Sequence, residues 1–281
     1  MLANPGSDRV RSVRRLSGRS ARLRSGRFVA EGPQAVREAV AAGAVRELYL
    51  TADAADRHAD LVEAARAAGV PPRLATAQVL AAMADTVTPQ GVLAVCGLID
   101  VPLAQVLAAR PLLVAVLAQV RDPGNAGTVI RAADAAGADA VLLTDCSVDV
   151  HSPKCVRSTA GSLFHLPVVV GVTLAQAVSG LRSAGLTVYA ADGAGATDLD
   201  DLLDAAAAGG RGGLAGPVAW VFGNEAWGLP ATDRELADTT VRVPVHGSAE
   251  SLNLATAATV CLYACARAQR RAAGCRTTGG G

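Results

Sequence analysis

The sequence Val221-Phe222-Gly223-Asn224-Glu225-Ala226-Trp227-Gly228-Leu229-Pro230 joins the end of an apolar run to a short, glycine-containing loop. The run Val218–Phe222 predicts a buried strand, and a proline suits the first turn of a helix that follows the loop. Gly223 and Gly228 would let backbone groups approach a ligand closely. An ordinary strand-to-helix turn, with Trp227 as a core anchor, explains this stretch equally well.

A second segment of the same kind is Asp122-Pro123-Gly124-Asn125-Ala126-Gly127-Thr128-Val129-Ile130-Arg131. It follows the predicted strand Leu112–Ala118, at the sheet edge where open α/β folds bind ligands. Asn125 could cap the helix 125–136, and an arginine near a helix N-terminus can hold a phosphate. Helical spacing predicts a buried face of Val129, Ala132 or Ala133, and Ala136, and another face of Thr128, Arg131 and Ala135. Taken alone, a capped helix with one solvated arginine explains this segment better.

The third segment is Val243-Pro244-Val245-His246-Gly247-Ser248-Ala249-Glu250-Ser251-Leu252-Asn253-Leu254. Ser251 could cap a long helix that extends to about Arg271. Small residues at helical spacing between Ala257 and Ala268 would permit close packing against another helix. His246 is a conceivable base because imidazole groups titrate near neutrality, but it has no acidic partner nearby in the sequence. A surface-loop role is the simpler interpretation.

Strands and helices alternate regularly from Leu112 onward. The predicted strands are 112–118, 140–144, 167–170, 187–191, 218–222 and 240–243, and the helices between them are 125–136, 153–162, 173–184 and 198–206. Continuous apolar strands of this kind predict a mostly parallel sheet with helices on both faces. Before residue 100, helices at 33–43 and 56–69 and strands at 45–50, 72–75 and 92–96 predict a separate small α/β domain.

Composition excludes several classes of protein. The chain has 281 residues and is 51% hydrophobic, enough for a real core, but its apolar runs are too short to span a bilayer. The N-terminus lacks the pattern of a signal peptide, so we expect a cytoplasmic protein that does not engage a membrane. The six cysteines form no CxxC pair and should be reduced. Cys146, His151 and Cys155 lack a fourth ligand, so no metal is expected.

The charge is unevenly distributed. The net charge of the whole chain is +1. Residues 1–30 have a net charge of about +7, and the remaining residues have a net charge of about −6. The basic side chains of this leader are Arg9, Arg11, Arg14, Arg15, Arg19, Arg22, Arg24 and Arg27. Arginine pairs with phosphate groups, so nucleic acid is a candidate partner. A solvated, arginine-rich terminus is an equally good interpretation of the charge alone.

Together the three segments resemble the signature motifs of the SpoU (TrmH-like) branch of the SPOUT methyltransferases. The patterns N-x-G-x-x-x-R, F-G-N-E-x-x-G-L and P-x-x-G-x-x-x-S-L-N occur in the family's order, and the resemblance covers about residues 112–271. Residues 8–97 resemble, less strongly, the small L30e-like domain that many members carry in front. That resemblance depends on the layout and on Phe28-Val29-Ala30-Glu31-Gly32, which matches a common F-x-x-E-G opening.

The resemblance implies a domain plan and an activity. It predicts a basic leader (1–25), an L30e-like RNA-binding domain (26–97), a linker (98–111), a catalytic domain tied into a deep trefoil knot (112–271) and a disordered tail (272–281). The implied reaction is methylation of a ribose 2′-hydroxyl, most simply in 23S rRNA, with S-adenosylmethionine as methyl donor and no metal. Members are usually homodimers in which the knotted domains pack together.

The resemblance also implies site residues. The catalytic set would be Arg131, Asn125, Glu225, Ser251 and Asn253. Methyl-donor binding would involve Phe222, Gly223, Asn224, Gly228, Val243, Pro244, Val245, Gly247, Ser251, Leu252 and Ala255. RNA would contact the eight leader arginines and Arg131. Because a guanidinium group stays protonated at neutral pH, we expect Arg131 to hold a phosphate and orient the hydroxyl rather than act as the base.

Other interpretations stay open at this point. A dinucleotide-binding fold or a conventional methyltransferase fold would need a glycine-rich fingerprint after the first strand, and Asp192-Gly193-Ala194-Gly195 is only a weak echo in the wrong place. The substrate could be tRNA, or the chain could be a non-catalytic RNA-binding or ribosome-assembly protein. The sequence does not separate a housekeeping role from antibiotic resistance.

Overall fold

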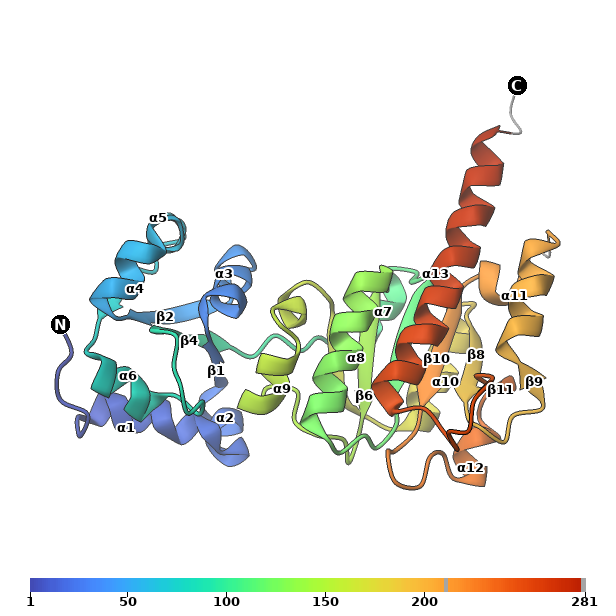
Figure 1. Ribbon diagram of the computed structural model, residues 1–281, viewed down its shortest axis with the longest axis horizontal. Helices are drawn as coiled ribbons and strands as arrows, with labels where there is room; N and C mark the ends of the chain where they lie inside the picture. The colour runs from blue at the N-terminus through green and yellow to red at the C-terminus, as the bar shows by residue number, and fades with distance from the viewer. Residues whose placement is uncertain (210–211, 279–281) are drawn as a thin grey trace. The chain divides into compact units, whose positions relative to one another are not determined.

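The computed structural model describes residues 1–209 and 212–278, with side chains described up to residue 273 (Figure 1). The chain forms two compact units. The first unit contains residues 1–99 together with 149–165, and the second contains 100–148 together with the residues from 166 onward. The sequence did not indicate that 149–165, inside the predicted catalytic domain, would join the first unit.

The first unit is built on a four-stranded sheet of order β1-β4-β2-β3. Its strands are β1 (Arg27–Glu31), β2 (Val45–Leu50), β3 (Arg73–Leu74) and β4 (Val92–Gly97). Its helices after β1 are α3 (Pro33–Ala41), α4 (Ala52–Arg57), α5 (Ala59–Ala67) and α6 (Ala77–Met83). The small α/β domain is therefore confirmed. Helix α5 is shorter than the predicted helix 56–69, and β1 was not predicted as a strand.

The basic leader is folded into the first unit. It forms α1 (Asp8–Arg14), a 3-10 turn (Arg15–Ser17) and α2 (Arg19–Ser25). Val10, Val13 and Leu16 are buried in the same apolar cluster as Val79 and Leu80 of α6. The leader arginines therefore stand on an ordered surface, with one exception that corrects the RNA-binding set.

That exception is Arg22, which is only 3% exposed and so is not available to a phosphate. Its guanidinium lies 2.7 Å from Asp149 Oδ2 and also donates to the carbonyl oxygens of Leu16 (2.8 Å) and Ser17 (2.6 Å). A buried charge needs such partners because desolvation is costly. Arg22 thus ties the leader to the segment 149–165.

We expect Arg22→Ala to destabilise the first unit by about 3–5 kcal/mol, because it leaves the Asp149 carboxylate without its charged partner. Urea unfolding followed by circular dichroism measures this change. Arg24→Ala, on the exposed side of the same helix, is the matched control and should change the free energy of unfolding by less than about 0.5 kcal/mol. Equal effects of the two substitutions would contradict the structural role of Arg22.

The segment 149–165 contains α9 (Pro153–Ser158) and a 3-10 turn (Ser162–Phe164). One helix over 153–162 was predicted, but the backbone turns at Ala160 and Gly161, whose φ angles are +50° and +104°. These angles break a right-handed helix, and at Gly161 a side chain would also meet Glu38 of α3, 2.7 Å from its Cγ. Phe164 stacks on the buried Phe28 of β1, with ring centroids 6.0 Å apart.

The second unit contains a seven-stranded parallel sheet of order β7-β6-β5-β10-β8-β11-β9. Its strands are β5 (Leu113–Leu117), β6 (Ala140–Thr144), β7 (Val168–Val172), β8 (Thr187–Ala191), β9 (Thr197–Asp198), β10 (Val218–Phe222) and β11 (Thr239–Arg242). Its helices are α7 (Leu103–Ala108), α8 (Pro123–Ala136), α10 (Leu174–Ser183), α11 (Leu199–Ala207), α12 (Ala231–Arg234) and α13 (Leu254–Thr278). The predicted α/β class with a parallel sheet is confirmed, and only the edge strand β9 was not predicted.

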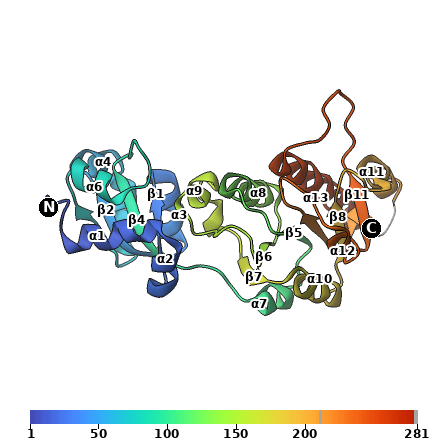
Figure 2. The same cartoon turned by 90° about the horizontal axis from the view of Figure 1, so that it is seen from below.

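Helices cover both faces of this sheet. Figure 2 shows α8 and α13 on one face and α7 and α10 on the other. Alternate residues of the central strands point to opposite faces of the sheet. On the α10 side, Val114 and Val116 of β5 pack in the cluster that contains Leu181 of α10. On the α13 side, the fully buried Trp220 of β10 donates from Nε1 to Cys265 Sγ at 3.1 Å. Burial raises the pKa of the Cys265 thiol to about 12, so it stays protonated.

Both ends of α13 differ from the sequence prediction. The helix begins at Leu254 rather than Ser251, and Asn253 caps it by accepting a hydrogen bond from the Ala255 N–H at 2.9 Å. It continues to Thr278, through residues that were assigned to a tail. The rest of that tail, residues 279–281, lies outside the described residues. The trefoil knot stays a prediction from the resemblance.

Candidate active site and donor pocket

A large pocket lies at the carboxyl ends of β8, β10 and β11, within the second unit. Its volume is about 1090 Å³. The loop after β10, the chain 242–246 after β11 and the residues 250–257 around the start of α13 form most of its wall. In a parallel sheet this edge collects the loops that follow several strands, which is why ligands bind there.

The loop after β10 is tightly closed. The backbone N–H of Asn224 donates to the Gly228 carbonyl at 3.0 Å, and the Gly228 N–H donates back at 2.9 Å. The Asn224 side chain is buried and donates to the carbonyl oxygen of Gln119 at 2.8 Å. A Cβ on Gly223 would clash with the carbonyl group of Gly228 and lie 2.7 Å from the backbone nitrogen of Leu229, so only glycine fits at that position.

We expect Gly223→Ala to weaken binding of S-adenosylmethionine by at least about tenfold, because the loop must open to relieve the clash between the new Cβ and the Gly228 backbone. Isothermal titration calorimetry measures this affinity. Gly247→Ala is the matched control: a Cβ there meets nothing within 4 Å, and Gly247 does not line the pocket. A donor affinity unchanged in Gly223→Ala would show that this loop does not bind the donor.

The three motif segments meet through a chain of hydrogen bonds. The Glu225 carboxylate accepts from the backbone N–H groups of Arg121 (3.3 Å) and Asp122 (3.2 Å) and from Asn125 Nδ2 (3.3 Å). Asn125 Oδ1 in turn accepts from Asn253 Nδ2 at 3.2 Å. One carboxylate and two amides therefore hold the starts of α8 and α13 against the loop after β10. All three side chains belong to the predicted catalytic set, but contact between them was not predicted.

Asp122 caps the N-terminus of α8, whereas the sequence had predicted Asn125 as the cap. Asp122 Oδ1 accepts from the Asn125 N–H at 2.8 Å, which satisfies a first-turn donor and leaves the Asn125 side chain available to Glu225 and Asn253. The predicted faces of α8 are confirmed: Val129, Ala132, Ala133 and Ala136 are buried, whereas Thr128, Arg131 and Ala135 are exposed.

Arg131 lies on the exposed face of α8, six residues or about 9 Å along the axis from Asn125. Within the described residues, no hydrogen bond or ion pair engages its side chain. An arginine without a protein partner can pair bidentately with an external phosphate. The structure does not bring Arg131 into contact with the Glu225–Asn125–Asn253 chain.

Trp227 is not the core anchor that one sequence interpretation gave it. Its side chain is 49% exposed, and the Arg121 guanidinium lies 5.1 Å from the ring centroid, within the range of a cation–π contact. The buried indole is Trp220, in the middle of β10. Trp227 therefore presents an aromatic surface at the pocket wall.

Most predicted donor-binding residues line the pocket. They are Phe222, Gly223, Asn224, Gly228, Val243, Pro244, Val245, Ser251 and Leu252. Two do not: Gly247 and Ala255, the latter because it is buried in the first turn of α13. Ser251 lies in the wall but neither caps α13 nor joins the hydrogen-bond chain.

Sequence reasoning missed part of the wall. Asp192 and Gly193, set aside as a weak fingerprint, line the pocket from the end of β8, and Asp192 lies 3.5 Å from Arg234. His246, placed on a surface loop, also lines it. The backbone N–H of Asp200 and the Arg242 guanidinium hold the pKa of the Asp198 carboxyl below its usual range, so this wall residue is ionised at neutral pH.

The lining suits an adenosine that carries a charged amino-acid tail. Val243 and Leu252 give apolar surface for a flat base, and Gly223 and Gly228 line the cavity from the loop after β10. Asp192 and Glu250 supply carboxylates for hydroxyl or ammonium groups.

In the part of the chain that the structure describes, no group of three or more His, Cys, Asp or Glu is placed to hold a metal ion. Among the helices of the described residues, none combines the length and the apolar character of a membrane span.

Residues 112–263 match the model of the SpoU rRNA Methylase family, and residues 7–94 match an MRM3-like substrate binding domain. The chain is 32% identical to a Bacillus subtilis 23S rRNA (guanosine(2553)-2′-O)-methyltransferase, over 92% of this chain and 95% of the relative.

Two solved structures with bound S-adenosylmethionine share the fold. One is an rRNA methyltransferase from Sinorhizobium meliloti, with a TM-score of 0.81 and 29% identity over 95% of this chain and 97% of that one. The other is the SpoU methyltransferase AviRb from Streptomyces viridochromogenes, with a TM-score of 0.79 and 32% identity over 94% and 99%. Both cover the two units of the chain.

Proposed function

Because this chain belongs to the SpoU rRNA methylase family, we infer that it transfers a methyl group from S-adenosylmethionine to a ribose 2′-hydroxyl of 23S rRNA. The observation that carries this function is the Glu225–Asn125–Asn253 chain, which joins three separate segments at the rim of the 1090 Å³ pocket. The donor is supported by the relatives with bound S-adenosylmethionine, and the substrate class by the Bacillus subtilis relative.

The reaction places modest demands on the protein. S-adenosylmethionine, when bound, supplies a methyl group that its positive sulfur makes electrophilic. The ribose oxygen must then be held in line with that methyl carbon. As the new O–C bond forms, the bond between the methyl carbon and sulfur breaks, S-adenosylhomocysteine leaves with that electron pair, and the hydroxyl proton passes to solvent. Positioning of this kind can account for most of the rate, since well-oriented groups react as if at very high concentration.

Arg131 and the Glu225–Asn125–Asn253 hydrogen-bond chain have separate roles in this positioning. Arg131, which has no protein partner among the described residues, holds the phosphate next to the target ribose and so orients the hydroxyl. Glu225, Asn125 and Asn253 hold the loop after β10 to the starts of α8 and α13, so that the donor pocket and the arginine keep a fixed geometry. Because the Glu225 carboxylate already accepts three hydrogen bonds, its role is positioning rather than proton transfer.

We expect Glu225→Ala to lower the single-turnover rate of methyl transfer by about tenfold or more, because three donors lose their shared acceptor and the α8 start shifts. Glu225→Gln, which keeps one acceptor oxygen, should restore part of the rate. Glu235→Ala removes an exposed carboxylate close by in the sequence and should leave the rate unchanged. A wild-type rate in Glu225→Ala would show that the Glu225–Asn125–Asn253 hydrogen bonds have no part in the mechanism.

Three further features belong to this proposal. The chain acts as a homodimer through α13, where Val260 (40% exposed) and Tyr263 (49% exposed) place apolar surface one helical turn apart. The knot implied by the family resemblance encloses the donor pocket. The protein works in the cytoplasm, where ribosomal RNA is available as substrate.

Transfer of tritiated methyl groups from S-adenosylmethionine to purified rRNA and tRNA pools tests the function. We expect label in 23S rRNA and none in tRNA. Label in tRNA alone would favour the tRNA alternative. Calorimetry separates the remaining alternative, because a non-catalytic RNA-binding protein would bind RNA without binding the donor.

A further inference from the structure

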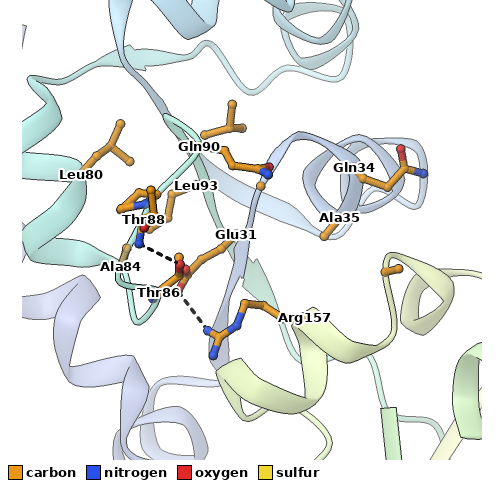
Figure 3. Close-up of a pocket in the computed structure, with 14 residues that line it drawn as sticks. Glu31, Gln34, Ala35, Leu80, Ala84, Thr86, Thr88, Gln90, Leu93 and Arg157 are labelled. Atoms are coloured by element: carbon orange, nitrogen blue, oxygen red, sulfur yellow. Dashed lines mark hydrogen bonds and ion pairs between the residues drawn. The ribbon is translucent and has the colours of Figure 1, made fainter. Parts of the chain in front are cut away.

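The first unit contains another cavity, of about 300 Å³, which the proposed methyl-transfer site does not use (Figure 3). Its wall starts where β1 ends, at Glu31 and Gly32, and continues along the first turn of α3 and the loop 84–91 between α6 and β4. Arg157 of α9 and Ala160 complete it. The cavity thus combines residues from the substrate-binding match with residues from the SpoU match.

Hydrogen bonds hold this cavity open. The Glu31 side chain is only 5% exposed, and its carboxylate accepts from the N–H groups of Asp85 (2.8 Å) and Thr86 (3.2 Å). Arg157 Nη1 donates to Asp85 Oδ2 at 2.9 Å and lies 3.9 Å from Glu31 Oε1. Figure 3 shows the Glu31 carboxylate between the loop and the Arg157 guanidinium. The loop 84–91 is therefore fixed to β1 and α9 before any ligand arrives.

The lining combines apolar faces with an amide edge. Ala35, Leu80 and Leu93 form the apolar part of the wall, and the exposed side chain of Gln90 stands at the rim. Figure 3 shows the Gln34 amide turned away from the other lining side chains. Within the described residues, no hydrogen bond engages the Gln90 amide, so both its donor and its acceptor can meet a ligand, whereas Gln34 Nε2 donates to Glu38 at 3.0 Å. The charges of Glu31 and Arg157 compensate each other, so the lining favours a neutral ligand.

The loop 84–91 adds an exposed apolar contact beside the mouth. Val87 is fully exposed, and it stands between Thr86 and Thr88, which both line the cavity. A fully exposed valine on a loop that the protein holds in place is available to pack on a flat, partly apolar group. Neutral charge, apolar faces and a hydrogen-bonding edge are together the chemistry of a nucleobase.

We propose that this cavity binds one unstacked nucleobase of the substrate RNA, with the Gln90 amide meeting its hydrogen-bonding edge and Ala35 contacting one of its faces. The proposal rests on the proposed function, because it takes RNA as the substrate. A volume of about 300 Å³ is at the lower end of ligand pockets, which fits one base rather than two. Glutamine amides can pair bidentately with a base edge, and RNA-binding proteins commonly take single bases out of the stack.

Two substitutions in the full chain test the cavity. Gln90→Leu removes the amide at nearly constant size, and Ala35→Phe fills the space. With radiolabelled 23S rRNA transcript in a filter-binding assay, we expect the Kd of each variant to rise by about tenfold, within the range for removal of a base-edge hydrogen bond. Gln78→Leu, an exposed glutamine of α6 that does not line the cavity, should stay within twofold of wild type. Donor affinity, measured by calorimetry, should be unchanged in all three.

Cross-linking gives an independent measurement. Transcript that contains 4-thiouridine should, after irradiation, cross-link to a peptide from residues 84–93 in the wild type and lose that cross-link in Ala35→Phe. If wild-type protein methylates the transcript but both variants bind it as tightly as wild type, the cavity proposal is overturned and the methyltransferase function stands. If wild-type protein neither binds nor methylates the transcript, both are overturned. Because Gln90 is exposed, Gln90→Leu decides the matter should Ala35→Phe prove unstable.

Discussion

Arg131→Ala is expected to lower the single-turnover rate of methyl transfer by at least about 100-fold while the affinity for S-adenosylmethionine stays within twofold of wild type. The guanidinium has no protein partner in the described residues, so its removal leaves the fold and the pocket intact. The variant can no longer hold the phosphate beside the target ribose. Rapid quench of enzyme mixed with excess RNA and tritiated donor measures the rate, and calorimetry measures the affinity.

Two variants sharpen this result. Arg131→Lys keeps the charge but not the bidentate fork, so its rate should fall between those of wild type and Arg131→Ala. Arg271→Ala removes an exposed arginine from α13 of the same unit and should leave the rate unchanged. Unchanged single-turnover transfer in Arg131→Ala would remove this residue from the mechanism.

The second large effect concerns RNA capture by the leader. Arg14, Arg15, Arg19 and Arg24 are exposed, and within the described residues no ion pair engages them. The other leader arginines have acidic partners: Arg9 and Arg27 with Glu47, Arg11 with Asp8 and Arg22 with Asp149. The first four are therefore the best placed to meet phosphates.

Replacing these four arginines together by alanine should raise the Kd for 23S rRNA by roughly 10- to 100-fold at low salt. It should also reduce the slope of log affinity against log salt concentration by about 0.7–0.9 for each phosphate that is no longer neutralised. The matched variant with four lysines keeps the charge and should retain most of the affinity and the slope. An alanine variant with a wild-type slope would show that the leader arginines do not contact phosphate.

The sequence predicted the elements of the second unit well because its strands are continuous apolar runs between helices. The strands 140–144, 187–191 and 218–222 have the expected bounds. Such runs have few alternatives, since a buried parallel strand must be apolar on both faces. Helix starts were predicted less well: Asp122 and Asn253 cap the helices for which Asn125 and Ser251 were expected. Several neighbouring residues at each helix start can act as the cap, and tertiary contacts determine which of them does so.

The candidate site was predicted in part. Motif spacing singled out Glu225, Asn125 and Asn253, but only the sheet topology brings them within hydrogen-bond distance. Arg22 was expected on the surface because arginine usually is, and nothing in its neighbourhood indicated a partner 127 residues away. Asp192 was dismissed because it fitted no fingerprint, yet it follows β8, which lies next to β10 in the sheet. Contacts between residues distant in sequence were the information that local patterns lacked.

The position of the methyl group on the RNA tests the central claim most directly. After transfer of tritiated methyl groups, 23S rRNA is hydrolysed completely in alkali, and the labelled products are separated by size and charge. A methylated 2′-oxygen cannot attack the neighbouring phosphate, so a ribose methyl group leaves the label in an alkali-resistant dinucleotide. We predict that nearly all the label appears there and that Arg131→Ala abolishes it. Label in mononucleotides would place the methyl group on a base and contradict the account.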